Sequence, residues 1–139
     1  MSPRFASGAG QTVARRAWGV ALLDFLLVTL FVAIGLHSHH QGAHLSEFAL
    51  VLYPFALGTG LGEFGVRRTN LSPETLAGGV IVALSTVVLG MLLRVFNGQG
   101  TDVAFVIVAT LFVSFFLLSW RLAVHFWRRR SAKTDTTSP

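Results

Sequence analysis

The chain has 139 residues, the length of one domain, of which 53% are hydrophobic and only 12% are charged. Soluble domains carry about 25% charged residues, so this composition excludes an ordinary soluble protein, and it equally excludes a disordered chain. The absence of cysteine excludes a disulfide scaffold, a thiolate metal site and a cysteine nucleophile, and the net charge of +5 comes mainly from arginines.

Four segments of the sequence are long and apolar enough to cross a bilayer, whose hydrocarbon core needs about 20 apolar residues per helix. These segments lie at 17–36, 45–64, 76–96 and 103–124. None shows the alternating pattern of a barrel strand. We therefore predict an all-α integral membrane four-helix bundle, with a transmembrane domain at 17–127, a flexible tail at 1–16 and a basic tail at 128–139.

The arginines and lysines alternate from one side of the predicted membrane to the other. The two tails and the loop after the second segment hold nine of them, whereas the loops after the first and third segments hold none. The nine are Arg4, Arg15, Arg16, Arg67, Arg68, Arg128, Arg129, Arg130 and Lys133. Because cytoplasmic loops are enriched in these residues, we predict cytoplasmic N- and C-termini and a multi-pass protein of the bacterial plasma membrane.

The first segment contains one charged residue, Asp24, and the fourth contains Arg121. At about 1.5 Å per residue, each lies roughly 10 Å from the cytoplasmic end of its segment. Charged groups at such a depth are costly and usually face a partner or a water-filled cavity, so we expect the two to meet. The pair is either a fixed ion pair that holds two helices together or a site where protonation of the carboxylate is coupled to transport.

The loop after the first segment contains the sequence HSHHQGAH. Its four histidines are His37, His39, His40 and His44. Imidazole side chains on a loop bind Zn²⁺ or other divalent metals, and Glu47 could add a carboxylate. The spacing matches no defined metal geometry, so a solvated loop is the alternative interpretation. No other cofactor is predicted.

The second segment carries Gly58 and Gly62, a G-x-x-x-G pair that allows two helices to approach closely. Glu63 and Arg67 are four residues apart, and we expect them to pair at the cytoplasmic surface. The run GLGEFG has the letters of a dinucleotide-binding fingerprint, but no strand precedes it, which argues against that function.

The third segment contains Arg94 near its outer end, and a short connection, NGQGT, leads to the fourth segment. The third and fourth helices must therefore be antiparallel neighbours. Asp102 follows the connection, and Arg94 is within reach of the surface, so we expect an ion pair between the two. The alternative to this ion pair is that Arg94 contributes to a transport path.

No pattern in the sequence indicates an enzyme. A nucleophile paired with a base, a phosphate-binding loop and the H-E-x-x-H motif are all missing from it. The arginines lack interleaved aromatic residues in a soluble module, which argues against nucleic acid as a partner.

Seven short stretches, taken in order, resemble an uncharacterised family of small four-span membrane proteins, mostly actinobacterial, classed as a domain of unknown function. They are Leu23-Asp24, FVAIG at 31–35, Ser38-His39, Pro54-Phe55, TVVLGMLLR at 86–94, GQGTDVAF at 98–105 and Trp120-Arg121. The resemblance implies that Asp24, His39, Arg94 and Arg121 match positions that the family typically keeps. Leu36 and His37 stand where relatives tend to carry arginines, which puts in doubt any role for basic residues there.

Three functions remain open. Asp24, Arg94 and Arg121, with His39, favour a small ion- or proton-linked transporter or channel, since ionisable residues in spans usually mark a transport path. The small size and the lack of an internal repeat favour a non-catalytic accessory or assembly subunit, which would pack through its G-x-x-x-G face on a larger membrane complex. Metal binding by the outer histidine loop is the third. Besides the lipid bilayer, the expected partner is a second copy or that larger complex.

Overall fold

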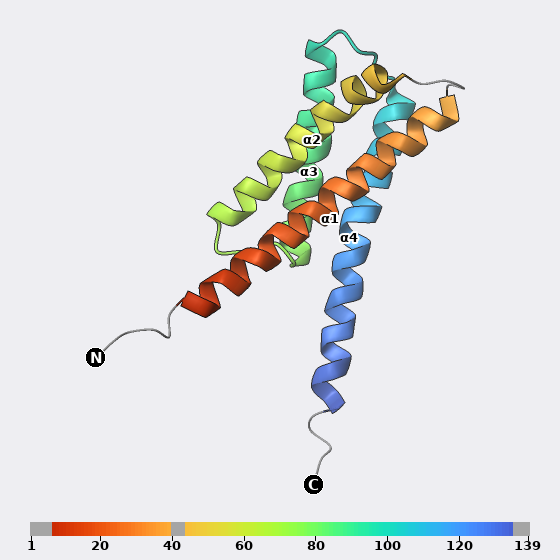
Figure 1. Cartoon of the computed structure of the whole chain (residues 1–139). Coiled ribbons are helices and arrows are strands. Elements are labelled where there is room, and N and C mark those ends of the chain that lie inside the picture. The colour runs from red at the N-terminus through yellow and green to blue at the C-terminus, as the bar shows by residue number, and fades with distance from the viewer. Residues whose placement is uncertain (1–6, 40–43, 135–139) are drawn as a thin grey trace.

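A computed structural model of the chain describes residues 7–39 and 44–134, and these residues form four helices (Figure 1). The helices are α1 (Ser7–His39), α2 (Leu45–Arg68), α3 (Leu76–Phe96) and α4 (Val103–Thr134). All four are long and apolar enough to cross a membrane. The prediction of an all-helical bundle with four membrane spans is therefore confirmed, and the described part of the chain contains no strand.

The helix bounds agree with the predicted span for α3 and with the predicted starts of α2 and α4, but α1, α2 and α4 are longer than predicted. Helix α1 begins at Ser7, well before residue 17, and α4 continues to Thr134. Part of each sequence that we expected to be a tail is thus helical. A helix satisfies its own backbone hydrogen bonds and can continue beyond the bilayer, so hydropathy does not mark its ends. Residues 1–6 and 135–139 lie outside the described residues.

Helices α2 and α3 pack closely through the two glycines of the G-x-x-x-G pair. A Cβ on Gly58 would lie 2.8 Å from the carbonyl oxygen of Ser85, and one on Gly62 would lie 2.9 Å from the Cα of Val82. The Ser85 hydroxyl donates a hydrogen bond of 2.8 Å to the Gly58 carbonyl. Gly58 and Gly62 therefore pack inside the bundle. The expectation that this face packs on a larger complex is wrong, because α3 already covers it.

The apolar core is built where α1, α2, α3 and α4 face one another. Phe31 and Phe55 meet edge to face with ring centroids 5.7 Å apart, and Val82 and Leu117 are fully buried beside them. Large apolar side chains on the outside, such as Leu111, are exposed, which suits helices that face lipid.

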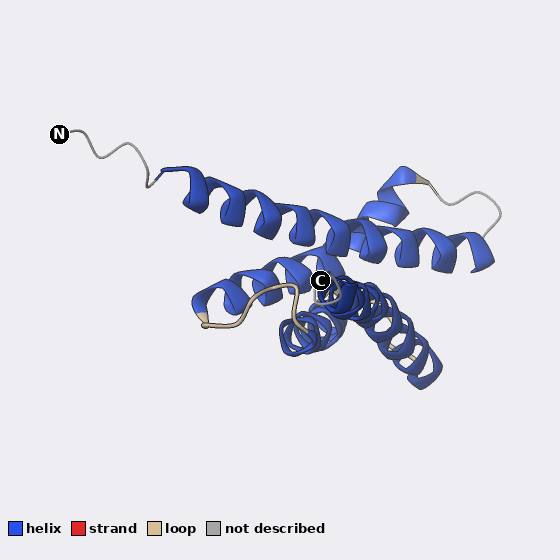
Figure 2. Cartoon of the chain, turned by 90° about the horizontal axis from the view of Figure 1, so that it is seen from below, coloured by secondary structure: helices blue, strands red, loops and turns tan. Residues whose placement is uncertain are grey.

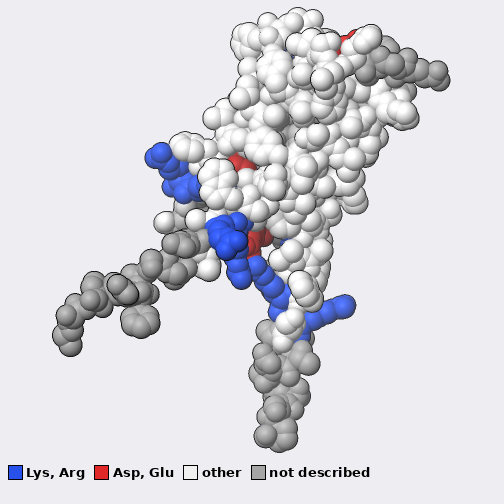
Figure 3. Space-filling model, viewed as in Figure 1, with Lys and Arg blue, Asp and Glu red and all other residues white. Residues whose placement is uncertain are grey.

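Helices α1 and α4 cross and then diverge toward the end of the bundle where α1 begins and α4 ends (Figures 1 and 2). Most Lys and Arg side chains gather at this end, which we call the basic end (Figure 3). The basic end comprises the first turns of α1, the last turn of α2 and the last turns of α4. The opening between α1 and α4 faces it, and the buried charges described next lie just inside.

Candidate functional site: a buried charge cluster

Asp24 of α1 and Arg121 of α4 form a two-pronged ion pair inside the bundle. Nη1 of Arg121 donates to Oδ1 of Asp24 at 3.0 Å, and Nη2 donates to Oδ2 at 2.6 Å. Both side chains are completely buried. The structure thus brings together the two charges that the sequence placed at equal depth. A bidentate arginine–carboxylate pair also fixes the relative orientation of the two groups.

Two further N–H groups of Arg121 also donate hydrogen bonds. Nε donates to the carbonyl of Pro73 at 3.0 Å, in the connection between α2 and α3, and Nη1 also donates to the carbonyl of Leu117 at 2.8 Å. The indole of Trp120 lies against the guanidinium, 4.5 Å from ring centroid to Cζ, and its Nε1 donates to Oδ1 of Asp24 at 2.9 Å. The guanidinium is therefore held in one orientation by three parts of the chain.

Gly79 of α3 provides the space that Arg121 occupies. A Cβ at this position would lie 2.5 Å from Cδ and 2.9 Å from Nε of Arg121. The Arg121 side chain cannot move away without giving up its hydrogen bonds. A residue without a side chain is therefore required opposite the arginine.

Glu63 of α2 is a third member of the cluster, and the sequence analysis did not identify it. Its Oε1 lies 3.6 Å from Nη2 of Arg121, and its Oε2 lies 3.7 Å from Nη2 of Arg67. The expected contact between Glu63 and Arg67 is present, but Glu63 is buried and only 3% exposed, not at the surface. Neither of its carboxylate oxygens accepts a hydrogen bond from the described residues.

The spacing of buried residues in α2 could have identified Glu63. Phe55, Thr59, Glu63 and Val66 recur every three to four residues and are all buried, so they share the inner face of the helix. The pairing of Glu63 with Arg67 hid this pattern, because a pair spaced by four residues is common on exposed helix faces.

The charge balance of the cluster is uneven. The carboxylates of Asp24 and Glu63 both lie within 4 Å of the same nitrogen, Nη2 of Arg121. The only other cation at the cluster among the described residues is Arg67, which also donates to the carbonyl of Ala17 at 3.0 Å. The Arg67 side chain is 28% exposed, so its charge is partly screened by the surroundings. Two buried carboxylates therefore share one fully buried guanidinium.

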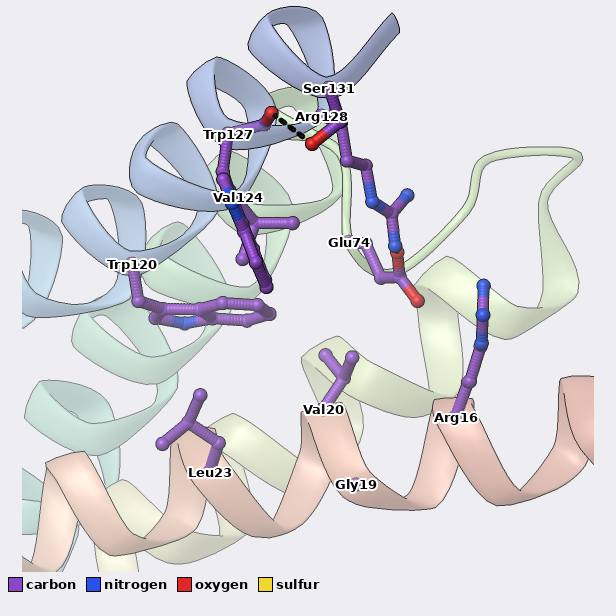
Figure 4. Close-up of a pocket in the computed structure, with 10 residues that line it drawn as sticks. All are labelled: Arg16, Gly19, Val20, Leu23, Glu74, Trp120, Val124, Trp127, Arg128 and Ser131. Carbon is purple, nitrogen blue, oxygen red and sulfur yellow. Dashed lines mark hydrogen bonds and ion pairs between the residues drawn. The ribbon is translucent and has the colours of Figure 1, made fainter. Parts of the chain in front are cut away.

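A pocket of about 620 Å³ lies between the diverging parts of α1 and α4 (Figure 4). Leu23 and Val20 of α1 form one wall, and Trp120 and Val124 of α4 form the other. Trp120 is at once a wall of the pocket and a hydrogen-bond donor to Asp24. The indole therefore separates the ion pair from the open cleft.

Arg94, the third intramembrane charge of the sequence, lies in the last turn of α3, at the opposite end of the bundle (Figure 1). Its Nη2 donates to the carbonyl of Gly100 at 3.0 Å, and its Cζ lies 4.5 Å from the ring centroid of Phe105. Nε and Nη1 have no hydrogen-bond partner among the described residues. No ion pair joins Arg94 to Asp102, so that expectation is wrong; the tight turn instead brings a backbone carbonyl to the guanidinium.

The histidine loop is described only in part. His37 is exposed in the last turn of α1, which continues to His39 and so includes the first residues of the predicted loop, and His44 is exposed just before α2. His40 and the side chain of His39 lie outside the described residues. Within the described part of the chain, no three acidic or histidine side chains are grouped as a metal site would require. Metal binding by this loop stays a prediction.

These observations define a four-helix multi-pass membrane protein with a buried cluster of charges between its helices. Residues 21–124 match the family described as protein of unknown function (DUF3054), and the chain belongs to that family. The matched segment contains all three members of the cluster. No curated protein and no solved structure matches the chain.

Proposed function

We propose that this protein is a proton-linked membrane transport protein, in which Asp24 and Glu63 are the proton-binding groups and Arg121 is their shared counter-charge. One observation supports this most: two buried carboxylates from different helices lie within 4 Å of the same guanidinium nitrogen. A structural clamp needs only one of them. The second carboxylate is buried and accepts no hydrogen bond from the described residues, which is costly unless it has another role.

The two carboxylates offer Arg121 two alternative partners. In the structure Asp24 holds the guanidinium through two hydrogen bonds, while Glu63 lies 3.6 Å away. A proton on Asp24 would remove the charge that holds Arg121, and Glu63 would then become the better partner. Protonation can in this way exchange one ion pair for the other inside the cluster.

Such an exchange would alter the packing of α1 against α4. Asp24 is bonded to α4 twice through Arg121 and once through Trp120. Loss of these contacts would free Trp120 from Asp24 and join the pocket between α1 and α4 to the ion pair. The charged groups that face the cluster are Arg121 from α4 and Arg67 from α2, with the Pro73 carbonyl from the α2–α3 connection.

A proton suits this cluster better than a metal cation. Arg121 already places a positive charge between the two carboxylates, and it would repel a second cation at a distance of a few ångström. A proton binds by forming a bond to one carboxylate oxygen, which changes the charge without needing a cavity for an ion. The expected site of action is the bacterial plasma membrane, with the basic end in the cytoplasm.

Infrared spectroscopy and proton flux in lipid vesicles test the proposal together. We expect the carbonyl band of a protonated carboxylic acid to rise and fall with pH in the wild type and to change in Glu63→Gln and Asp24→Asn. Vesicles that contain the wild type and an internal pH dye should acidify under an imposed membrane potential, whereas both variants should behave as protein-free vesicles.

Glu47→Gln is the matched control, because Glu47 is an exposed acid on the same helix as Glu63. It should retain both the band and the proton flux. A wild type that shows no titrating band and no flux above empty vesicles would contradict proton binding by this cluster. Equal flux in the wild type and in Glu63→Gln would contradict the role given to Glu63.

A further inference from the structure

The pocket between α1 and α4 has two chemically different ends (Figure 4). Arg16, Glu74 and Arg128 lie together at one end, and the rings of Trp120 and Trp127 lie at the other. The other lining residues are mainly apolar. They are Gly19, Val20, Leu23, Val124 and Ser131. The volume of about 620 Å³ falls within the range of known ligand pockets, roughly 300–1,000 Å³.

The charged end is positive overall. Arg128 is paired with Glu74, whereas Arg16 forms no ion pair within the described residues. The Arg16 side chain also lines a neighbouring hollow of about 510 Å³, which contains His125 and Arg128. One arginine is therefore free to bind an anion, and the second is placed beside it by Glu74. A phosphate group is the anion that two neighbouring guanidinium groups bind well.

The apolar end indicates where that phosphate comes from. The pocket is open along the diverging helices α1 and α4, and both are candidate membrane spans over the residues that line it, Ala14–His37 and Val103–Ser131. A soluble anion would contact only the arginine end of the pocket, and the apolar lining residues would stay exposed to water. A phospholipid places its phosphate on the arginines and its glycerol and first methylene groups along Val20, Leu23 and Val124. Tryptophan side chains are typical of this level of a membrane.

We infer that the cleft between α1 and α4 at the basic end is a binding site for the headgroup of an anionic phospholipid, held by Arg16 and Arg128. The site does not depend on the proton-linked function, because neither arginine belongs to the charge cluster. Trp120 forms its inner wall, and the same indole donates a hydrogen bond to Asp24.

Quenching of tryptophan fluorescence by brominated lipids tests the inference. Trp120 and Trp127 line the cleft, and Trp18→Phe removes the third tryptophan, which is exposed and lies elsewhere against Arg67. The protein is reconstituted with brominated phosphatidylglycerol or brominated phosphatidylcholine at equal mole fractions. We expect the anionic lipid to be preferred by about fivefold, the effect of one unpaired arginine near the membrane surface.

Two variants distinguish a defined site from general attraction to a basic surface. Arg16→Gln/Arg128→Gln should abolish the preference, whereas Arg15→Gln/Arg129→Gln should retain it. The second variant removes the same charge from the same two helices, one residue away, and neither of its positions lines the pocket. An equal loss of preference in both variants would overturn the inference.

Gly19→Phe provides a test that leaves every charge in place. A Cβ at Gly19 meets no atom within 4 Å, so the side chain of a phenylalanine there begins in open space at the wall of the cleft. This variant should fold as the wild type and lose the preference. Retention of the preference in Gly19→Phe, its absence in the wild type, or its removal by inorganic phosphate at constant ionic strength would each overturn a lipid site. The last result would indicate a soluble anion instead.

Discussion

Asp24 and Arg121 are 97 positions apart in the chain and are joined by two hydrogen bonds of 3.0 and 2.6 Å inside the bundle. Trp120, the residue before the arginine, donates a third hydrogen bond from α4 to the same carboxylate. Helices α1 and α4 diverge at the basic end (Figure 1), and these hydrogen bonds join the two helices.

Breaking this pair from one side should destabilise the protein. Removal of one partner of a buried ion pair costs about 3–5 kcal/mol, because the other charge stays buried and unpaired. Asp24→Ala and Arg121→Ala should each lower the free energy of unfolding by this order, as measured by denaturant titration in detergent. Arg121→Ala should be the more severe, since it also leaves Glu63 without its nearest cation.

The double variant Asp24→Ala/Arg121→Ala should recover part of the loss, because Asp24 no longer needs a counter-charge. Recovery should be incomplete, since Glu63 remains buried. Addition of Glu63→Gln to the double variant should restore more stability. Single variants as stable as the wild type would show that the two residues do not meet in the folded protein.

Gly79→Ala tests the close approach of α3 to Arg121. The added methyl group would lie 2.5 Å from Cδ of Arg121, and the hydrogen bonds of the guanidinium prevent the side chain from moving aside. Crowding of this kind costs about 1–3 kcal/mol. Gly65→Ala is the control, because a Cβ at Gly65 meets no atom within 4 Å, and thermal unfolding should be unchanged or slightly improved. Equal melting temperatures for the two variants would contradict the packing at Gly79.

Arg94 should behave in the opposite way to Arg121. It is buried, but two of its nitrogens have no hydrogen-bond partner and no carboxylate lies at ion-pair distance within the described chain. Replacing an uncompensated buried charge by an apolar group of similar size removes its desolvation cost. Arg94→Met should therefore leave thermal stability unchanged or raise it, whereas Arg121→Met should lower it. A large loss in Arg94→Met would indicate a counter-charge outside the described residues.

The orientation in the membrane can be tested with single cysteines, because the natural chain has none. Asn70 and Asn97 are both exposed, in the connections between α2 and α3 and between α3 and α4. The excess of arginines at the basic end predicts that only Asn97→Cys reacts with an impermeant thiol reagent added to intact cells. Labelling of Asn70→Cys under the same conditions would reverse the predicted topology.

From the four histidines of the loop we predict that the purified protein binds Zn²⁺ or Ni²⁺ with about one ion per chain. One ion is expected because a single imidazole binds these metals weakly and several must converge on the same ion. His39→Ala/His40→Ala should abolish the binding measured by calorimetry. His125→Ala is the control, because His125 lies on α4 at the basic end, away from the loop. Equal binding before and after the double change would leave only a solvated loop.

The helices themselves could be predicted from the sequence because membrane insertion depends on a local property. Each run of apolar residues indicates a span by its own length, whatever the rest of the chain does. The starts of α2 and α3 therefore agree with the sequence prediction, at Leu45 and Leu76. The depth of Asp24 and Arg121 in the membrane could also be predicted from the sequence, since it follows from counting residues along a helix of known rise.

The place of Glu63 in the charge cluster was decided by the tertiary structure, whereas the meeting of Asp24 with Arg121 was predicted from their equal depth. The rotation of each helix about its axis determines which side chains meet, and it is set by packing between helices, such as the contact of Gly58 and Gly62 with α3. This packing turns Glu63 inward to Arg121 and leaves Arg94 beside Gly100. Sequence spacing shows which residues share a helix face, but it does not show which neighbouring helix that face packs against. The partners of a buried charge are therefore fixed only when the bundle assembles.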